Sequence, residues 1–294
     1  MPSGRRLAEE PDWERWLPGP ARELLAEMDG RVARIPTRLN EYGIDRFGFD
    51  PSVARYAMAL MAWVYRHYLR VETRGVEKVP QGRVLLIANH AGNTFAWDGA
   101  MLATSLFLEG EPPRVVRGMG EYFLPTIPFF NVMMHRMGSV VGRPENCVQL
   151  LEEEEAIMAF PEGERGFVKT FDQRYQLQRF GLGFVRLALE TGTPIVPVGI
   201  VGAEEQSPGL ANPRWIGRLF GSPAFPITPT FPWLGALGML PFPVKFHLHF
   251  GAPIFFEGDA NEDDAAIEER VEMVKAEIRR LISDGRAARS NWFF

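Results

Sequence analysis

A histidine and an aspartate, His90 and Asp98, stand at the two ends of a short loop. The loop follows residues 84–88, a nearly continuous apolar run that is typical of a strand buried on both faces of a parallel sheet. Open α/β sheets bind their ligands at the carboxyl ends of strands, so we expect His90 to lie at a ligand-binding or catalytic site. A carboxylate beside the imidazole would hold it in one tautomer and make it a better base. The alternative is a turn histidine followed by a helix cap.

Three further stretches fall where strands are expected to begin or end. Arg143 follows residues 138–142, and a guanidinium at a strand end can contact a phosphate through two parallel hydrogen bonds. Residues 160–166, Phe-Pro-Glu-Gly-Glu-Arg-Gly, form a tight loop after another predicted strand, and prolines in 193–198 restrict the backbone where a strand begins. The residues of interest in the second stretch are Glu162, Gly163 and Arg165. Each stretch alone is more typical of a surface charge or an ordinary turn.

In this order, the four stretches resemble the motifs of the glycerol-phosphate and lysophospholipid acyltransferase family of membrane-lipid synthesis. The resemblance covers residues 71–202, about half the chain, and residues 48–51 and 202–205 are similar to a bacterial branch of the family. The matching residues, block by block, are Asn89, His90 and Asp98; Gly138 and Arg143; Phe160, Pro161, Glu162, Gly163 and Arg165; and Pro194, Ile195, Val196 and Pro197.

The resemblance implies transfer of a fatty acyl group from a thioester donor to a hydroxyl of a glycerolipid or lysophospholipid. The donor would be acyl-coenzyme A or acyl carrier protein, acting as a co-substrate, with no metal or other cofactor. His90 would be the general base and Asp98 would orient it. The residues implied in substrate binding are Asn89, Arg143, Glu162, Gly163 and Arg165. Two alternatives stay open, a non-catalytic lipid-binding protein on the same fold and a lipid hydrolase.

The sequence departs from the family pattern at two places. Seven residues separate His90 from Asp98, where the family usually has four. Either the longer loop preserves the contact between the two side chains, which we favour because no other acid lies between His90 and Glu109, or Asp98 has lost that role. Glu164 stands where the family more often has Thr or Ser. It adds a negative charge beside the proposed phosphate site and argues against a simple glycerol-phosphate acceptor.

Helix and strand signals alternate from about residue 71 onward, which predicts an α/β fold with a mostly parallel sheet flanked by helices. Residues 71–294 would form the acyltransferase-like domain, and residues 1–70 an N-terminal helical extension that is a candidate for membrane contact. Predicted strands are 71–74, 84–88, 114–117, 139–141, 156–160, 195–201 and 244–250. Predicted helices are 21–32, 56–65, 98–108, 145–155, 180–190 and 263–283, the last ended by Gly285.

Composition limits the partners of the chain. The 32 Lys+Arg residues against 37 Asp+Glu give a net charge of −5, so no overall basic field attracts nucleic acid. One cysteine, Cys147, excludes an internal disulfide, and His247 with His249 is more typical of a structural pair than of a metal site.

No apolar stretch of about 20 residues predicts a membrane-spanning helix. We therefore expect a peripheral protein on the cytoplasmic, inner face of the membrane, whose partners are the acyl donor, the lipid acceptor and the membrane surface. The stretches that could contact the membrane are 56–65, 220–246 and 292–294.

Overall fold

The computed structural model describes residues 12–120, 130–219 and 225–293. Its strands are β1 (Glu72–Arg74), β2 (Val84–Ala88), β3 (Val116–Gly120), β4 (Val140–Val141), β5 (Ala156–Ala159), β6 (Ile195–Val201) and β7 (His247–Phe250). Its α-helices are α1 (Gly19–Val32), α2 (Pro51–Trp63), α3 (Trp97–Glu109), α4 (Phe130–Arg136), α5 (Pro144–Glu152), α6 (Glu164–Phe167), α7 (Gly183–Thr191), α8 (Ala203–Gln206), α9 (Arg214–Leu219) and α10 (Asp264–Ala288). Short helical turns occupy η1 (Asp12–Trp16), η2 (Val64–Tyr68), η3 (Val76–Lys78), η5 (Phe171–Gln173) and η6 (Gly235–Met239).

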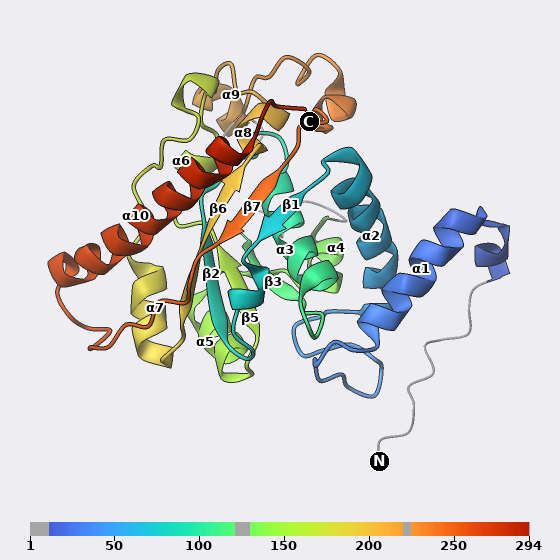
Figure 1. The fold of residues 1–294 in the computed structure, drawn as a ribbon, viewed down its shortest axis with the longest axis horizontal. Coiled ribbons are helices and arrows are strands. Elements are labelled where there is room, and N and C mark those ends of the chain that lie inside the picture. Colours follow the sequence, from blue (N-terminus) through green and yellow to red (C-terminus); the bar gives the residue numbers. More distant parts are fainter. Residues whose placement is uncertain (1–11, 121–129, 220–224, 294) are drawn as a thin grey trace.

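One seven-stranded sheet, in the order β1-β7-β6-β2-β5-β3-β4, forms the centre of the molecule (Figure 1). Neighbouring strands are parallel except β6 and β7, which are antiparallel. The predicted α/β fold with a mostly parallel sheet is therefore confirmed. Strand β2 pairs with β5 on one side and β6 on the other, so the residues that follow it lie at the middle of the carboxyl edge.

The side chains of β2 alternate between two hydrophobic layers. Val84, Leu86 and Ala88 pack in one cluster with buried residues of α1, α2 and α3. Leu85 and Ile87 pack in a second cluster with α5, α7 and α10 on the opposite face. Every residue of β2 is buried, as expected for a strand covered by helices on both faces. Two apolar layers thus hold this strand, and the loop after it, in place.

Helix α2 belongs to the first of these layers. Asp50 caps its first turn by accepting a hydrogen bond from the Ser52 N–H, and Pro51 at the first helical position needs no partner for an N–H. Met58 and other residues on one face are buried in the cluster, while Leu60 and Trp63 on the other face are exposed. The apolar run at 56–65 therefore contributes both to the core and to the surface.

The prediction that Gly285 ends the last helix is wrong, because α10 continues to Ala288. Gly285 is buried against the sheet, and a Cβ added to it would lie 2.9 Å from Val201 Cγ2. The glycine therefore permits close contact between α10 and β6 and does not act as a C-cap.

The two uninterrupted apolar strands, β2 and β6, have the bounds that the sequence predicted. Residues 121–129, 220–224 and 294, which include parts of the predicted membrane-contact segments 220–246 and 292–294, lie outside the described residues. Within the described ranges, no helix has both the length and the apolar character needed to cross a membrane.

Candidate active site

Asn89 extends the pairing of β2 with β6 by one residue. Its Nδ2 donates a hydrogen bond to the Ile200 carbonyl oxygen at 2.9 Å, and the Ile200 N–H donates to its Oδ1 at 2.8 Å. The side chain is completely buried. Both amide atoms contact backbone and hold the strand end from which His90 projects, and the predicted role of Asn89 in substrate binding stays a prediction.

His90 and Asp98 are in direct contact across the longer loop. Nδ1 of His90 lies 2.7 Å from Oδ2 of Asp98, which also accepts the Ala91 N–H at 2.7 Å. The other carboxylate oxygen, Oδ1, accepts the Gly99 N–H at 2.8 Å. Asp98 is fully buried, whereas 14% of the His90 side chain is exposed. Nε2 of His90 has no hydrogen-bond partner among the described residues, so it is the ring atom available to a substrate.

The loop accommodates its extra residues by packing against two neighbouring segments. The Asn93 N–H donates to the Phe167 carbonyl oxygen at 2.9 Å, and its side-chain amide donates to the Ser207 carbonyl oxygen at 2.7 Å. Asn93 has a φ of 55°, a left-handed conformation that asparagine tolerates better than most residues. The Gln206 side chain donates to the carbonyl oxygen of Gly92 at 3.2 Å. These contacts let seven residues return the chain to Asp98.

Aromatic rings and a glycine determine the position of the His90 ring. The ring stacks on Phe160 with centroids 4.3 Å apart. The Phe167 ring is tilted relative to the His90 ring, and their centroids are 5.1 Å apart. A Cβ added at Gly166 would lie 2.5 Å from Glu162 Cβ and 3.0 Å from His90 Cβ. Sequence analysis missed Phe167 and Gly166 as parts of the site, although Gly166 belongs to the quoted stretch 160–166. The only signal was its closeness to that motif.

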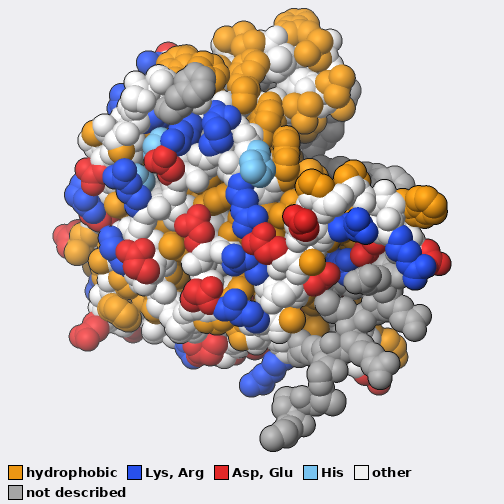
Figure 2. Space-filling model, turned by 45° about the vertical axis from the view of Figure 1, so that its right-hand side comes forward, with side chains coloured by type: hydrophobic (Ala, Val, Ile, Leu, Met, Phe, Trp, Pro, Cys, Tyr) orange, Lys and Arg blue, Asp and Glu red, His pale blue; other side chains and the backbone are white. Residues whose placement is uncertain are grey.

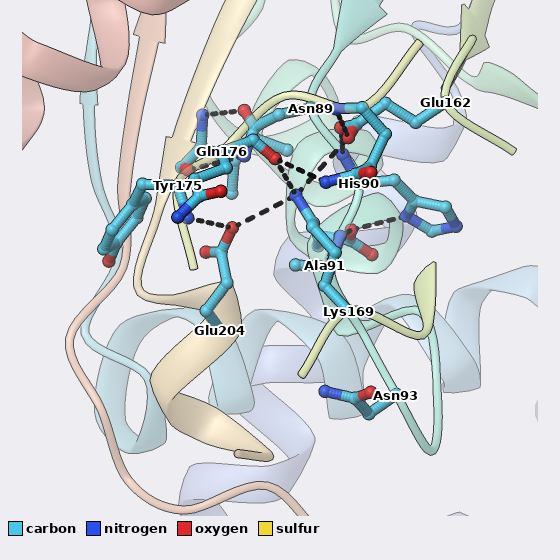
Figure 3. A network of polar contacts seen from close by, with 12 residues as sticks. Asn89, His90, Ala91, Asn93, Glu162, Lys169, Tyr175, Gln176 and Glu204 are labelled. Carbon is cyan, nitrogen blue, oxygen red and sulfur yellow. Dashed lines mark hydrogen bonds and ion pairs between the residues drawn. The ribbon is translucent and has the colours of Figure 1, made fainter. Parts of the chain in front are cut away.

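Glu162 lies inside the protein, on the loop after β5, with 1% of its surface exposed. Its Oε1 accepts the His90 N–H at 2.9 Å, and its Oε2 accepts the Gln178 N–H at 2.7 Å (Figure 3). Both carboxylate oxygens of Glu162 thus contact backbone N–H groups, and the implied role of Glu162 in substrate binding stays a prediction. The carboxylate holds the main chain of His90 through the His90 N–H.

Arg143 and Arg165 are exposed and form no ion pair or side-chain hydrogen bond in the part of the chain that the structure describes. Arg165 lies on α6, which Gly163 precedes with a left-handed φ of 57°. Arg143 precedes α5 and follows the edge strand β4. Since β4 is three strands from β2, its end lies about 14 Å from the end of β2. Both guanidinium groups are therefore free to bind an anion. Arg165 follows β5, which pairs with β2, and Arg143 lies farther along the same edge of the sheet.

Behind Glu162 lies a group of buried polar side chains that sequence analysis missed. Nζ of Lys169 is 3.4 Å from Glu162 Oε2 and 3.6 Å from Glu204 Oε1. Glu204 also accepts the Tyr175 N–H at 3.3 Å, and burial raises its pKa to about 7. The Tyr175 hydroxyl donates to Glu205. No periodic pattern marks these residues, because they belong to loops and short helices that are distant in sequence.

Other residues with possible chemistry are arranged for packing. Burial raises the pKa of the Cys147 thiol to about 11, so the thiolate that a nucleophile requires is scarce at neutral pH. His247 and His249 are both buried on β7, and burial lowers the pKa of His247 to about 4. In the described ranges no group of three or more His, Cys, Asp or Glu side chains is arranged to hold a metal ion.

Residues 70–201 match the family model described as Acyltransferase. The chain is 36% identical over 284 residues to an uncharacterized protein of Mycobacterium tuberculosis, an alignment that covers 94% of this chain and 78% of that protein. It is also 24% identical over 211 residues to the mouse DGAT1/2-independent enzyme synthesizing storage lipids, covering 72% of this chain and 59% of the mouse protein.

Among solved structures, the fold is similar to the 1-acyl-sn-glycerophosphate (LPA) acyltransferase PlsC from Thermotoga maritima, with a TM-score of 0.51 and 17% identity. That match covers 81% of this chain and 83% of the Thermotoga chain. The protein thus has the α/β fold of a glycerolipid acyltransferase. The chain belongs to the acyltransferase family.

Proposed function

We propose that the protein transfers a fatty acyl group from a thioester to a hydroxyl of a glycerolipid or lysophospholipid, with His90 as general base. The observation that carries the proposal is the contact of 2.7 Å between His90 Nδ1 and Asp98 Oδ2. This contact favours the tautomer with a proton on Nδ1 and a lone pair on Nε2. A base needs that lone pair on the atom that faces the substrate.

The reaction is a single acyl transfer. Nε2 of His90 takes the proton of the acceptor hydroxyl as its oxygen attacks the thioester carbonyl carbon. The new C–O bond forms and the C–S bond breaks, and the departing thiolate receives the proton from Nε2. Asp98 stabilises the imidazolium that exists between these events. The thioester is already activated, so the reaction requires no covalent enzyme intermediate, and Cys147 takes no part.

Two arginines support a role for an anionic group in one of the substrates. Arg143 and Arg165 are exposed at the same edge of the sheet as His90 and carry no internal partner in the described chain. In our proposal they hold a phosphate of the acceptor or of the donor. The negative charge of Glu164, beside Arg165, would weaken the binding of a doubly charged phosphate monoester at that position. We therefore propose an acceptor with a less charged head group, such as a lysophospholipid diester or a partial glyceride.

We also propose that the protein works at the cytoplasmic face of a membrane, where a lipid acceptor resides. Figure 2 shows hydrophobic side chains gathered on the lobe at the top of the molecule, where Figure 1 places α9 and the segment after it. The exposed apolar residues of this segment, here called the upper apolar surface, are Leu210, Trp215, Leu219, Trp233, Leu234, Leu237 and Leu240. Trp97, next to Asp98, donates to the Met239 carbonyl oxygen at 3.5 Å, so this surface adjoins the start of α3. Contiguous exposed apolar surface of this kind is typical of membrane or partner contacts.

An assay of the purified protein tests the proposal. Labelled acyl-coenzyme A and acyl carrier protein are each offered with lysophosphatidate, a lysophospholipid diester, monoacylglycerol and diacylglycerol in vesicles, and His90→Ala supplies the background. Formation of a labelled glycerolipid that depends on His90 supports acyl transfer. Release of free fatty acid alone would instead indicate the hydrolase, and lipid binding without turnover would indicate the non-catalytic protein.

A further inference from the structure

The Lys169 ammonium lies deep in the protein, with 3% of the residue exposed. A charge at this depth is costly unless opposite charges and hydrogen-bond acceptors surround it. Its neighbours are Glu162 Oε2 at 3.4 Å, the Gln176 carbonyl oxygen at 3.4 Å and Glu204 Oε1 at 3.6 Å. Two carboxylates therefore share one buried cation.

One of these carboxylates links the ammonium to the backbone of His90. Glu162 accepts the His90 N–H through Oε1 and the Gln178 N–H through Oε2. Because Glu162 is buried, water does not offset its negative charge. Without Lys169, two backbone N–H groups would have to hold a buried carboxylate alone, and the carboxylate would tend to move toward solvent.

The other carboxylate belongs to a different part of the fold. Glu204 lies on α8, directly after β6, and accepts the Tyr175 N–H at 3.3 Å. Figure 3 shows the Lys169 side chain pointing between Glu162 and Glu204. The ammonium thus joins the segments that follow β2, β5 and β6, which are neighbours in the sheet.

We infer that Lys169 is a positioning residue for acyl transfer, which acts through Glu162 to hold the main chain of His90 at the end of β2. The inference rests on the proposed function, in which His90 is the base. His90 then has two independent supports: Asp98 orients the ring, and the Lys169–Glu162 pair holds the backbone that carries the ring. Displacement of a catalytic group by about 1 Å can reduce a rate about 100-fold.

The test compares four variants of the full chain. Lys169→Met alone leaves Glu162 and Glu204 buried without their shared cation and can fail to fold, so the main variant is K169M/E204Q, which removes the ammonium together with the ionisable group of Glu204. E204Q alone retains the Lys169–Glu162 pair. K169R retains the cation. Lys275→Met is the matched control, because Lys275 is also buried but lies on α10, against the Phe180 ring and Glu272.

Two measurements are made on each variant. Steady-state kinetics in the acyl-transfer assay give kcat and KM for the donor, and hydrogen exchange with mass spectrometry follows the peptide containing the His90 N–H. For K169M/E204Q we expect kcat to fall by about 10- to 100-fold with KM for the donor changed by less than about threefold. We expect amide exchange at His90 to become about tenfold faster. E204Q alone should lose much less of its kcat than K169M/E204Q. K169R should have a kcat between those of K169M/E204Q and the wild type, and K275M should match the wild type in both measurements.

Each outcome has a separate meaning. A folded K169M/E204Q with the kcat and the His90 exchange of the wild type would overturn the inference, as would an equal loss in K275M. A loss of kcat without faster exchange would also overturn it, because the backbone of His90 would then be held by other contacts. If the wild type transfers no acyl group, the proposed function fails, and the exchange measurement still decides whether Lys169 holds the His90 backbone.

Discussion

At the residue scale, the catalytic proposal depends on His90, whose side chain can be replaced without disturbing the packing of the core. Its ring is partly exposed on a loop after β2, whereas the residues of the strand itself are buried. We expect His90→Ala to fold with a melting temperature close to that of the wild type and to lose about 100-fold or more in kcat, the contribution of a general base. Thermal unfolding and initial rates check the two halves of this prediction. Near-normal activity in a folded variant would contradict the mechanism.

Asp98 provides a finer test because it has three hydrogen-bond donors around it. Asp98→Asn keeps the shape of the side chain, but an amide N–H then faces His90 Nδ1 and favours the tautomer with its proton on Nε2. We expect kcat to fall by about 1000-fold, with a loss of stability smaller than that of a core truncation. The NMR shifts of the imidazole nitrogens report the tautomer directly. If Asp98→Asn keeps the proton on Nδ1, the assigned role of Asp98 is wrong.

Glu204 makes the stability of the fold depend on pH. Burial raises its pKa from 4.5 to about 7, so the folded state keeps a proton that the unfolded chain releases as the pH rises through this window. This contribution to stability is present below pH 4.5 and is lost as the pH passes 7. Glu204→Gln has no ionisable group at this position and lacks this pH dependence. Its free energy of unfolding, relative to that of the wild type, should therefore rise by on the order of 2 to 3 kcal/mol between pH 5 and pH 8. Urea unfolding at both values measures the difference, and a constant difference would refute the assignment.

At the scale of elements, the turn from β5 into α6 brings Glu162 and the His90 loop together only because residue 166 has no side chain. For Gly166→Ala we expect a destabilisation of about 1 to 3 kcal/mol together with a fall in kcat, because the new methyl group meets both Glu162 Cβ and His90 Cβ. Chemical denaturation and initial rates measure both effects.

The matched control is Gly183→Ala, at the first residue of α7, where nothing lies within 4 Å of an added Cβ. That variant should be as stable as the wild type or slightly more stable. If the two variants behave alike, the close approach at Gly166 has no functional consequence.

Elements with strong apolar character could be predicted from the sequence, whereas their directions and the polar interior could not. The continuous runs of β2 and β6 reveal their bounds because burial on both faces leaves no polar position. Strand β7 was predicted from alternation, but the period of two does not show that it runs antiparallel to β6. His90 and Asp98 could be found because a motif links them. Lys169 could not, because its partners Glu162 and Glu204 meet it only in the folded chain.

At the scale of the whole molecule, the sheet concentrates the site at one edge. The loops after β2, β5 and β6 contribute His90, Glu162 and Glu204, and these strands are direct neighbours although they are far apart in sequence. The long connection between β6 and β7 contains the upper apolar surface, and it is tied to the N-terminal part of the fold through Tyr68, whose hydroxyl donates to the Pro241 carbonyl oxygen at 2.7 Å. The same fold therefore places exposed apolar side chains beside the start of α3, close to the His90 loop.

The last prediction concerns attachment to a membrane through apolar contacts. The exposed face of α2 carries Trp63, and the upper apolar surface carries Trp233, which is 70% exposed. Since the net charge of the protein is −5, attraction to anionic lipid does not provide general attachment. We expect the wild type to sediment with lipid vesicles and to stay bound in high salt, because burial of apolar side chains is not screened. The double substitution Trp63→Glu and Trp233→Glu should weaken binding on the order of tenfold or more.

The matched control is Trp16→Glu, on η1 ahead of α1, since Trp16 is even more exposed but lies away from the upper apolar surface (Figure 1). It should sediment like the wild type. Activity on a short-chain, water-soluble acceptor should be the same in all three proteins, because no substitution touches the His90 loop, while activity on vesicle-borne acceptor should fall only in the double variant. Release of the wild type by salt would show that charge and not apolar contact attaches it. A wild type that never sediments with vesicles would make the acceptor a soluble molecule, and the loss of activity in the double variant would then not occur.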